Sequence, residues 1–252
     1  MRKPFVAGNW KMNTDKQAAV ALAQAVAQVA DARGDAMTVA VCPPFVYLDA
    51  ISTAVQGSAL AVGAQDLYFE GNGAFTGEIS TSMLKDVGCT YVLCGHSERR
   101  HVIGETDALI NKKLVAALNA GLKPILCVGE LLEERQAEQT ETVVDTQLKQ
   151  GLAGLDAAQM AQVTIAYEPV WAIGTGLTAT PAQAQEVHAF IRNVLAGLFG
   201  AAVADQTRIQ YGGSVKPDNT AELMTQPDVD GCLVGGASLK PESFAGIIKA
   251  AG

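Results

Sequence analysis

Short apolar runs recur along the chain, and most lack the apolar–polar alternation of a strand with one solvent face. Each run ends at glycine, proline or a cluster of polar residues, as expected of strands that are buried on both faces. The runs cover residues 5–7, 39–42, 60–62, 91–94, 125–128, 163–167, 209–211 and 232–234.

Between these runs, apolar residues follow the helical period. The clearest stripe begins at Val187 and recurs every three or four residues as far as Leu198. Thr180, Pro181 and Gln183 precede it and predict an N-cap, a first helical position and a closed capping box. Two further N-caps are predicted in the same way, at Thr14 and Thr106.

Eight strands that alternate with helices in a chain of 252 residues predict an α/β fold, the (β/α)8 TIM barrel of eight parallel strands. An open doubly wound sheet is the alternative, but it would place Gly-x-Gly-x-x-Gly after the first strand. Residues 8–11 read Gly-Asn-Trp-Lys instead. Because no linker or low-complexity tract divides the chain, we expect one domain over residues 1–252.

The composition narrows the class of partner. A net charge of -8 argues against a nucleic-acid groove or an anionic membrane surface. No apolar stretch is long enough to span a bilayer, and the first apolar run is too short for a signal peptide. A small anionic ligand stays possible, because backbone N–H groups and one lysine can hold a phosphate on an acidic protein.

The cysteines are scattered and odd in number, and no Cys-x-x-Cys pair occurs. This pattern indicates neither a disulfide framework nor a zinc site, so we expect no bound metal. Buried free thiols in a reducing compartment fit best, and we expect a cytoplasmic protein. The five are Cys42, Cys89, Cys94, Cys127 and Cys232.

Catalytic groups of a barrel lie at the carboxyl ends of its strands. Glu168 follows the run 163–167 and precedes Pro169. A single glutamate at such a position is usually solvated. However, about a dozen residues separate it from the helix at Pro181, whereas such loops commonly have about 2–6 residues. We therefore interpret Glu168 as a general base beside a lid, residues 169–176, that excludes water.

Two more polar residues follow strands. His96 comes after the run 91–94, and Ser97 and Glu98 resemble the start of a helix. The positive potential of a helix N-terminus disfavours the imidazolium, so His96 is predicted to act as a neutral donor. Lys11 follows the first run and could supply a fixed charge to a phosphate or an oxyanion. In isolation, a hydrogen-bonded rim histidine and a solvated lysine are the commoner interpretations.

Glycine-rich turns follow the last two runs, at 212–214 and 235–236. Backbone N–H groups that glycine leaves accessible commonly hold a phosphate there in barrels. Other candidates are weaker. His101 and His188 have no evident ligand partners, and His188 fits a helix surface. Cys127 is interpreted as packing behind the site, because no base is placed to activate it.

Taken together, these motifs resemble those of the triosephosphate isomerase family, in the same order along nearly the whole chain. The segments that carry the resemblance are residues 8–13, 42–44, 73–78, 95–100, 127–130, 167–176, 211–215 and 230–239.

The resemblance implies that dihydroxyacetone phosphate and glyceraldehyde 3-phosphate are interconverted without a cofactor. Glu168 matches the base that transfers a proton through an enediolate, and His96 matches the group that polarises the carbonyl. Asn9 and Lys11 match the pair that contacts the substrate. The positions that match the phosphate-binding residues are Gly174, Ser214, Gly235 and Gly236.

The resemblance also implies supporting residues and an assembly. Glu98 and Cys127 match positions that support the site. The family commonly forms a homodimer, in which the loop 73–78 inserts into the partner subunit, with Thr76 near the partner's site. Gln65 matches the same interface region.

Two positions depart from the family pattern. Leu177 stands where Lys is common, just after the lid, and Asp66 stands where Asn is common. Two alternatives remain. The first is another sugar-phosphate isomerase or an aldolase on the same barrel. An aldolase of the Schiff-base type would need a lysine inside the barrel, and no run carries one in its middle. A catalytically silent scaffold or binding protein would normally have lost site residues, and all of them are present.

Overall fold

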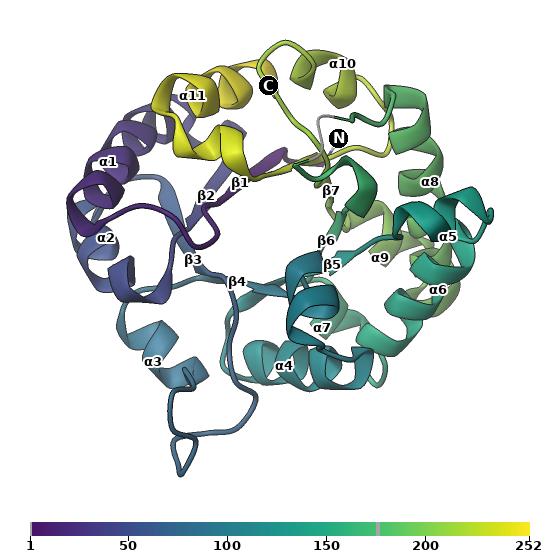
Figure 1. The fold of residues 1–252 in the computed structure, drawn as a ribbon, viewed down its shortest axis with the longest axis horizontal. Helices are drawn as coiled ribbons and strands as arrows, with labels where there is room; N and C mark the ends of the chain where they lie inside the picture. Colours follow the sequence, from purple (N-terminus) through teal and green to yellow (C-terminus); the bar gives the residue numbers. More distant parts are fainter. Residues whose placement is uncertain (1, 175–176) are drawn as a thin grey trace.

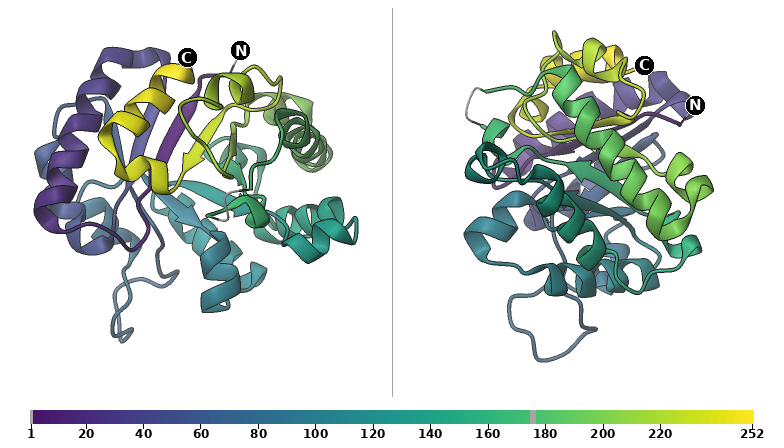
Figure 2. Two further views of the ribbon diagram at one scale, coloured as in Figure 1. Left: turned by 45° about the horizontal axis from the view of Figure 1, so that its top comes forward. Right: turned by 90° about the vertical axis from the view of Figure 1, so that its right-hand side faces the viewer.

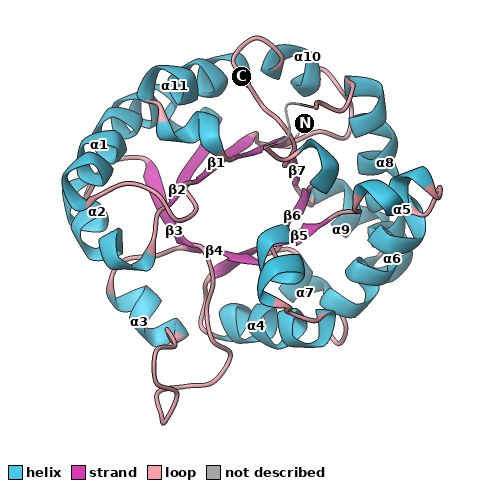
Figure 3. Ribbon diagram, viewed as in Figure 1, coloured by secondary structure: helices cyan, strands magenta, loops and turns pink. Residues whose placement is uncertain are grey.

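The computed structural model describes residues 2–174 and 177–252, and its strands form a closed barrel (Figures 1 and 3). The strands are parallel and neighbour one another in chain order, with helices around them. They are β1 (Phe5–Asn9), β2 (Thr38–Cys42), β3 (Leu60–Ala64), β4 (Tyr91–Cys94), β5 (Lys123–Val128), β6 (Thr164–Tyr167), β7 (Ile209–Tyr211) and β8 (Gly231–Val234). The predicted (β/α)8 barrel is therefore confirmed.

Closure is visible in the register of the first strand. Phe5 of β1 pairs with Thr38 on one side and with Gly231 on the other. An open doubly wound sheet would leave two edge strands, so that alternative is wrong. Because the strands are parallel, all their carboxyl ends lie at the same end of the barrel, and this is where the catalytic groups of this fold lie.

The barrel wall separates two apolar layers. Side chains such as Phe5 and Ala7 point inward and form a core inside the barrel, whereas Val6 packs outward against the helices. Each strand therefore buries both of its faces, which explains why its sequence reads as a continuous apolar run.

The helices form an outer ring around the strands (Figure 1). They are α1 (Lys16–Arg33), α2 (Leu48–Ala54), α3 (Thr81–Asp86), α4 (Asp107–Asn119), α5 (Leu132–Gln136), α6 (Thr140–Gly151), α7 (Ala157–Met160), α8 (Pro181–Phe199), α9 (Ala201–Gln206), α10 (Thr220–Met224) and α11 (Pro241–Ala250). Shorter helical turns are η1 (Gly34–Ala36), η2 (Phe45–Tyr47), η3 (Arg99–Ile103), η4 (Val170–Ala172) and η5 (Gly236–Leu239). No helix in the described part of the chain is long and apolar enough to cross a membrane.

Two of the three predicted helix caps are confirmed. Thr180 caps α8 in a closed capping box, and Thr106 caps α4. The prediction at Thr14 is wrong, because Asp15 is the N-cap of α1 and accepts a hydrogen bond from the backbone N–H of Ala18. Thr14 has a φ of 77° instead, so it belongs to the turn that leads into the helix.

One long loop leaves the ring. The segment between β3 and α3 projects beyond the helices, as two views in Figure 2 and the view in Figure 1 agree. It includes Thr76, which is exposed, and the ring of Phe75 stacks against Tyr68 with the centroids 4.9 Å apart. This aromatic contact joins two residues of the loop itself.

His188 was predicted on a helix surface, and that prediction is wrong, because its side chain is fully buried on α8. The ring lies between Tyr167 and Tyr211, with centroid distances of 5.8 Å and 6.3 Å. Its Nδ1 lies 3.1 Å from the carbonyl oxygen of Asp228. Burial lowers the pKa of His188 from its usual 6.5 to about 4.

Because His188 is buried with a lowered pKa, we expect the folded protein to lose stability as the pH falls. Between pH 6.5 and about 4, the unfolded chain binds a proton at His188 that the folded chain does not. The free energy of unfolding should therefore fall by about 1.4 kcal/mol per pH unit as the pH decreases through this window. Urea unfolding at pH 7, 6 and 5, at one protein concentration, measures the slope.

A His188→Asn variant should show a shallower acid slope, because its side chain does not titrate. The matched control replaces the exposed His101 with Asn, and its slope should equal that of the parent chain. Equal slopes for all three proteins would show that His188 does not couple folding to pH.

Candidate active site

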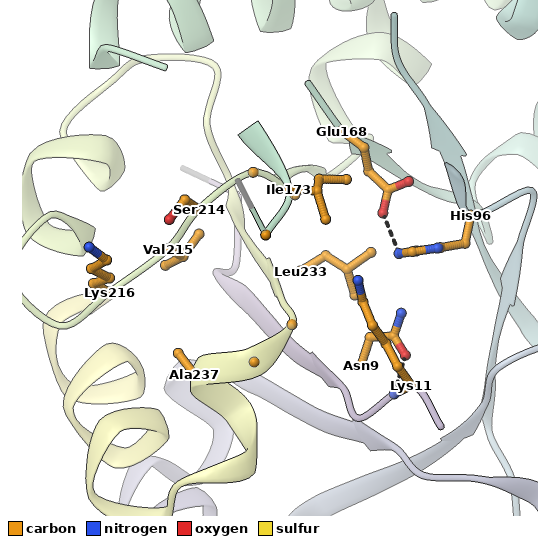
Figure 4. A pocket seen from close by; sticks show the side chains of 15 residues that line it. Asn9, Lys11, His96, Glu168, Ile173, Ser214, Val215, Lys216, Leu233 and Ala237 are labelled. Atoms are coloured by element: carbon orange, nitrogen blue, oxygen red, sulfur yellow. Dashed lines mark hydrogen bonds and ion pairs between the residues drawn. The ribbon is translucent and has the colours of Figure 1, made fainter. Parts of the chain in front are cut away.

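A cavity of about 250 Å3 opens at the carboxyl ends of the strands (Figure 4). Its wall brings together residues that lie far apart in the sequence. All the residues predicted to act in catalysis or substrate binding line it, namely Asn9, Lys11, His96, Glu168, Gly174, Ser214, Gly235 and Gly236. The cavity suits a small molecule, since drug-sized ligands occupy about 300–1,000 Å3.

Glu168 directly follows β6 and points into this cavity toward His96 (Figure 4). One carboxylate oxygen, Oε1, lies 3.0 Å from Nε2 of His96. The other, Oε2, accepts a hydrogen bond of 2.9 Å from the backbone N–H of Ser97. The side chain is only 2% exposed, so both oxygens depend on these protein donors.

Two glycines make room for this carboxylate. A Cβ at Gly129 would lie 1.8 Å from the carbonyl oxygen of Glu168, and one at Gly212 would lie 2.8 Å from its Cγ. Neither gap tolerates a side chain, because real Cβ contacts are not that short. The neighbouring strands can therefore approach Glu168 closely only with glycine at both positions. Sequence reasoning missed the role of Gly129, although it lies at the same strand end as Cys127.

The surroundings keep Glu168 ionised. Burial raises the pKa of a carboxyl group, but His96, the N–H of Ser97 and the charge of Lys11 together outweigh burial. The pKa of Glu168 is therefore lowered. At neutral pH the group is a carboxylate that can accept a proton.

The hydrogen bonds of His96 fix its tautomer. Its Nδ1 accepts the backbone N–H of Glu98 at 3.2 Å, so in the neutral ring Nε2 carries the proton and donates it to Glu168. Burial lowers the pKa of His96, but the carboxylate of Glu168 outweighs burial and raises it. This direction differs from the sequence prediction, which weighed the helix N-terminus without the partner carboxylate. Helical structure does begin at Ser97, as predicted.

Lys11 follows β1 with a left-handed backbone, at a φ of 53°. This conformation is uncommon for a residue with a side chain. Here the side chains of Asn9 and Gln65 each form a hydrogen bond with the backbone of Lys11. The backbone N–H of Lys11 donates to Oδ1 of Asn9 at 3.0 Å, and its carbonyl accepts from Nε2 of Gln65 at 2.8 Å. Its Nζ donates to Glu98 at 2.6 Å. The ammonium group is thereby held at the edge of the cavity (Figure 4).

The opposite wall is built from turns. Ser214 lies after β7, Gly235 follows β8, and Gly236 is the first residue of the helical turn η5. Gly174 also lines the cavity and has a φ of 70°. The last two residues of the predicted lid, 175–176, lie outside the described residues.

The first part of the predicted lid contacts a residue that sequence reasoning did not single out. Glu130 follows β5 and is fully buried. It accepts hydrogen bonds from Trp171 Nε1 at 2.9 Å and from the hydroxyl of Tyr167 at 3.1 Å, and Arg135 lies 3.2 Å away. Its place at a strand end on the same rim was the signal in the sequence that could have revealed it.

The two residues predicted to support the site do not line the cavity itself. Glu98 is half-exposed and approaches both Lys11 and Nδ1 of His96. Cys127 is fully buried, and burial raises the pKa of its thiol well above the usual range. A protonated thiol in such surroundings is a poor nucleophile, which agrees with a packing role. In residues 2–174 and 177–252, no group of three or more His, Cys, Asp or Glu side chains could hold a metal ion.

Beside the cavity, a second hollow of about 590 Å3 is lined by Gln65 and by exposed apolar side chains. Met12 is 95% exposed, Val102 77% and Ile103 64%. Thr76 does not line this hollow and belongs to the loop between β3 and α3.

Comparison with known proteins agrees with this geometry. A profile of the family described as triosephosphate isomerase matches residues 4–251. The chain is 56% identical over 250 residues to a triosephosphate isomerase of Rhodopirellula baltica, covering 99% of this chain and 98% of that protein. It is 58% identical over 250 residues to that of Carboxydothermus hydrogenoformans, covering 99% of both chains. The chain thus belongs to the triosephosphate isomerase family.

Proposed function

We propose that this protein interconverts dihydroxyacetone phosphate and D-glyceraldehyde 3-phosphate, with Glu168 as the base. As a member of its family, the chain is an isomerase that acts on triose phosphates. The observation that supports the residue roles best is the buried Glu168 carboxylate, which faces His96 and Lys11 across one small cavity. Its lowered pKa leaves it able to accept a proton at neutral pH.

In the proposed reaction, Glu168 takes the proton from the carbon next to the substrate carbonyl. The electron pair of that C–H bond moves toward the carbonyl oxygen and forms an enediolate. Nε2–H of His96 and the ammonium group of Lys11 stabilise the negative oxygen. A proton also has to move from the hydroxyl oxygen of the neighbouring carbon to this negative oxygen, and Nε2 of His96 can donate one and take up the other. Glu168 returns the first proton to the neighbouring carbon, so all protons are restored, the product is an isomer and no cofactor is consumed.

The substrate has to separate the resting pair for this to happen. In the structure, Nε2–H of His96 donates its hydrogen bond to Glu168. The substrate carbonyl would need this same donor. Once the carboxylate leaves Nε2, the main cause of the raised pKa of His96 is removed, while burial and Lys11 continue to lower it. We infer that His96 is neutral while it polarises the carbonyl.

The turns on the far wall would bind the phosphate. Gly174, Ser214, Gly235 and Gly236 all line the cavity, and Ser214 lies across it from the Glu168–His96 pair (Figure 4). Backbone N–H groups of such turns suit a dianion. Asn9 and Lys11 would contact the substrate between the two ends. Closure of residues 169–176 would exclude water from the enediolate, which otherwise could lose its phosphate.

We further infer that residues 1–252 form one domain that pairs as a homodimer. Pairing of β1 with β8 and the family match over residues 4–251 support one domain. The projecting loop between β3 and α3, and the exposed apolar side chains of Met12, Val102 and Ile103 in the second hollow, support insertion of the loop into a partner subunit. A sedimentation mass of one 26.2 kDa protomer at micromolar concentration would argue against the dimer. Buried free thiols support a cytoplasmic location.

The alternatives find less support. Among the described strands, the only lysine is Lys123, which is exposed at the start of β5, so a Schiff-base lysine inside the barrel is not available. A silent scaffold is not supported by the family membership. The direct experiment is a coupled assay of the purified chain with D-glyceraldehyde 3-phosphate, for which we expect turnover. No turnover by folded protein would contradict the proposal.

A further inference from the structure

Arg100 connects the ends of two barrel strands on either side of the catalytic pair. We propose that it is a positioning residue, which sets the orientation of His96 relative to Glu168 by joining β4 to β5 where their own pairing has stopped. The inference rests on the proposed function, since it concerns the geometry of the same reaction. Arg100 does not line the cavity, so it would act through other residues.

The pairing of β4 with β5 ends at Cys94 and Leu126. The next residues in register are Gly95 and Cys127, and Arg100 contacts both of them. Its Nε donates to the carbonyl oxygen of Gly95 at 2.7 Å, and its Nη2 donates to that of Cys127 at 2.9 Å. The guanidinium group thus bridges the two strands one position beyond their last pair. Without it, these two buried carbonyls would lose their side-chain donor.

The guanidinium is itself fixed. Its Nη1 donates to Oδ1 of Asp107, the first residue of α4, at 2.5 Å, and the side chain of Arg100 is only 7% exposed. Three donors on one rigid plane therefore hold a strand end, a second strand end and a helix start in one arrangement. A lysine has the charge but not the planar fork, so it cannot make all three contacts.

Gly95 is adapted to this contact. Its φ is 72°, and a Cβ there would lie 2.9 Å from Nη2 of Arg100 and 2.9 Å from Cδ1 of Ile110. Glycine therefore permits both the left-handed turn and the close approach of the guanidinium. The next residue after this turn is His96, so the contact to Gly95 sets the point from which the imidazole enters the cavity.

The second contact leads to the base. Cys127 is followed by Val128, whose carbonyl accepts the backbone N–H of Glu168 at 2.7 Å. On one side, Arg100 binds the carbonyl of Gly95, the residue before His96. On the other side, it binds the carbonyl of Cys127, and the next residue, Val128, is bonded to the backbone of Glu168. Because a misplacement of about 1 Å can cost about 10²-fold in rate, loss of this link should affect the chemical step.

The test compares Arg100→Lys with the parent chain in the coupled assay. We expect kcat to fall about 10²-fold in folded protein. KM should stay within about threefold, because the phosphate would bind to turns after β7 and β8 that Arg100 does not contact. A control for the general effect of losing a buried arginine is Arg192→Lys. Arg192 also donates to two carboxylates and to backbone carbonyls, but on α8, away from the cavity.

Histidine signals in NMR spectra separate positioning from a general loss of stability. The chain has only three histidines, so their ring nitrogens can be assigned. Arg100→Lys should shift the ring signals of His96 and leave those of His188 in place. Arg192→Lys should do the reverse, because Arg192 and His188 both contact the carbonyl oxygen of Asp228.

The outcomes are distinct. If Arg100→Lys lowers the melting temperature as Arg192→Lys does, while kcat and the His96 signals stay at parent values, the positioning role is wrong. The proposed function would then still stand, because it depends on turnover by the parent chain. If Arg100→Lys does not fold, Asp107→Ala decides, since it removes the acceptor of one of the three contacts. A smaller fall in kcat with shifted His96 signals would support the role, and unchanged values of both would overturn it.

Discussion

Replacing Glu168 with glutamine should lower kcat by at least about 10²–10⁴-fold, which is the usual contribution of a general base. The amide has nearly the shape of the carboxylate but cannot accept a proton from carbon at neutral pH. Its oxygen can still accept the N–H of Ser97, so the side chain should stay in place. Binding of unreactive phosphate-bearing analogues should consequently change little.

The measurement is kcat and KM in both directions of the reaction, together with calorimetric binding of an analogue. Glu186→Gln is the matched control, because it makes the same chemical change at an exposed position of α8. It should have parent kinetics. Near-normal turnover in Glu168→Gln would show that another group is the base.

Replacing Lys11 with methionine should lower kcat/KM by roughly 10³-fold or more. A hydrogen bond from a charged donor typically contributes about 1.5–3 kcal/mol, or roughly ten- to a hundredfold in binding. Loss of a donor to a developing oxyanion costs a further factor of about 10²–10³ in kcat. Methionine retains much of the apolar stem, so packing against the cavity wall is largely preserved.

Inhibition by inorganic phosphate gives the binding component separately. We expect the inhibition constant to rise in Lys11→Met and to change much less in Lys216→Met. Lys216 lines the same cavity, but its side chain points away from the Glu168–His96 pair (Figure 4). If the two variants lost phosphate affinity equally, the effect would reflect the general charge of the cavity and not a specific contact of Lys11.

The sequence was sufficient to predict the barrel, because strands buried on both faces read as continuous apolar runs. The prediction failed where two adjacent residues could serve the same purpose. Thr14 and Asp15 are both good N-caps, and only the backbone path decides which of them is used. The apolar stripe predicted for α8 was also partly wrong. It included Leu198, which is 42% exposed, and it left out His188, which is buried. The helical period alone does not show that a histidine can be buried when the carbonyl oxygen of Asp228 accepts a hydrogen bond from its ring.

For the site, the sequence identified which residues lie at the cavity but not how they pair. Strand order places Glu168, His96 and Lys11 at one mouth of the barrel. The direction of the pKa of His96, however, depends on the position of a carboxylate that is 72 residues away in the sequence. Arg100 and Glu130 were missed for the same reason, because their partners include the carbonyl of Cys127 on β5 and the hydroxyl of Tyr167 on β6.

The bond between Glu168 and His96 makes each of these residues a ligand of the other. Any substrate therefore competes with an internal ligand that is always present at high effective concentration. The apparent affinity equals the intrinsic affinity multiplied by the fraction of molecules in which the pair is open. If the bond between Glu168 and His96 were weaker, the protein would bind substrate more tightly. The carboxylate of Glu168 would then be protonated more easily by water between turnovers.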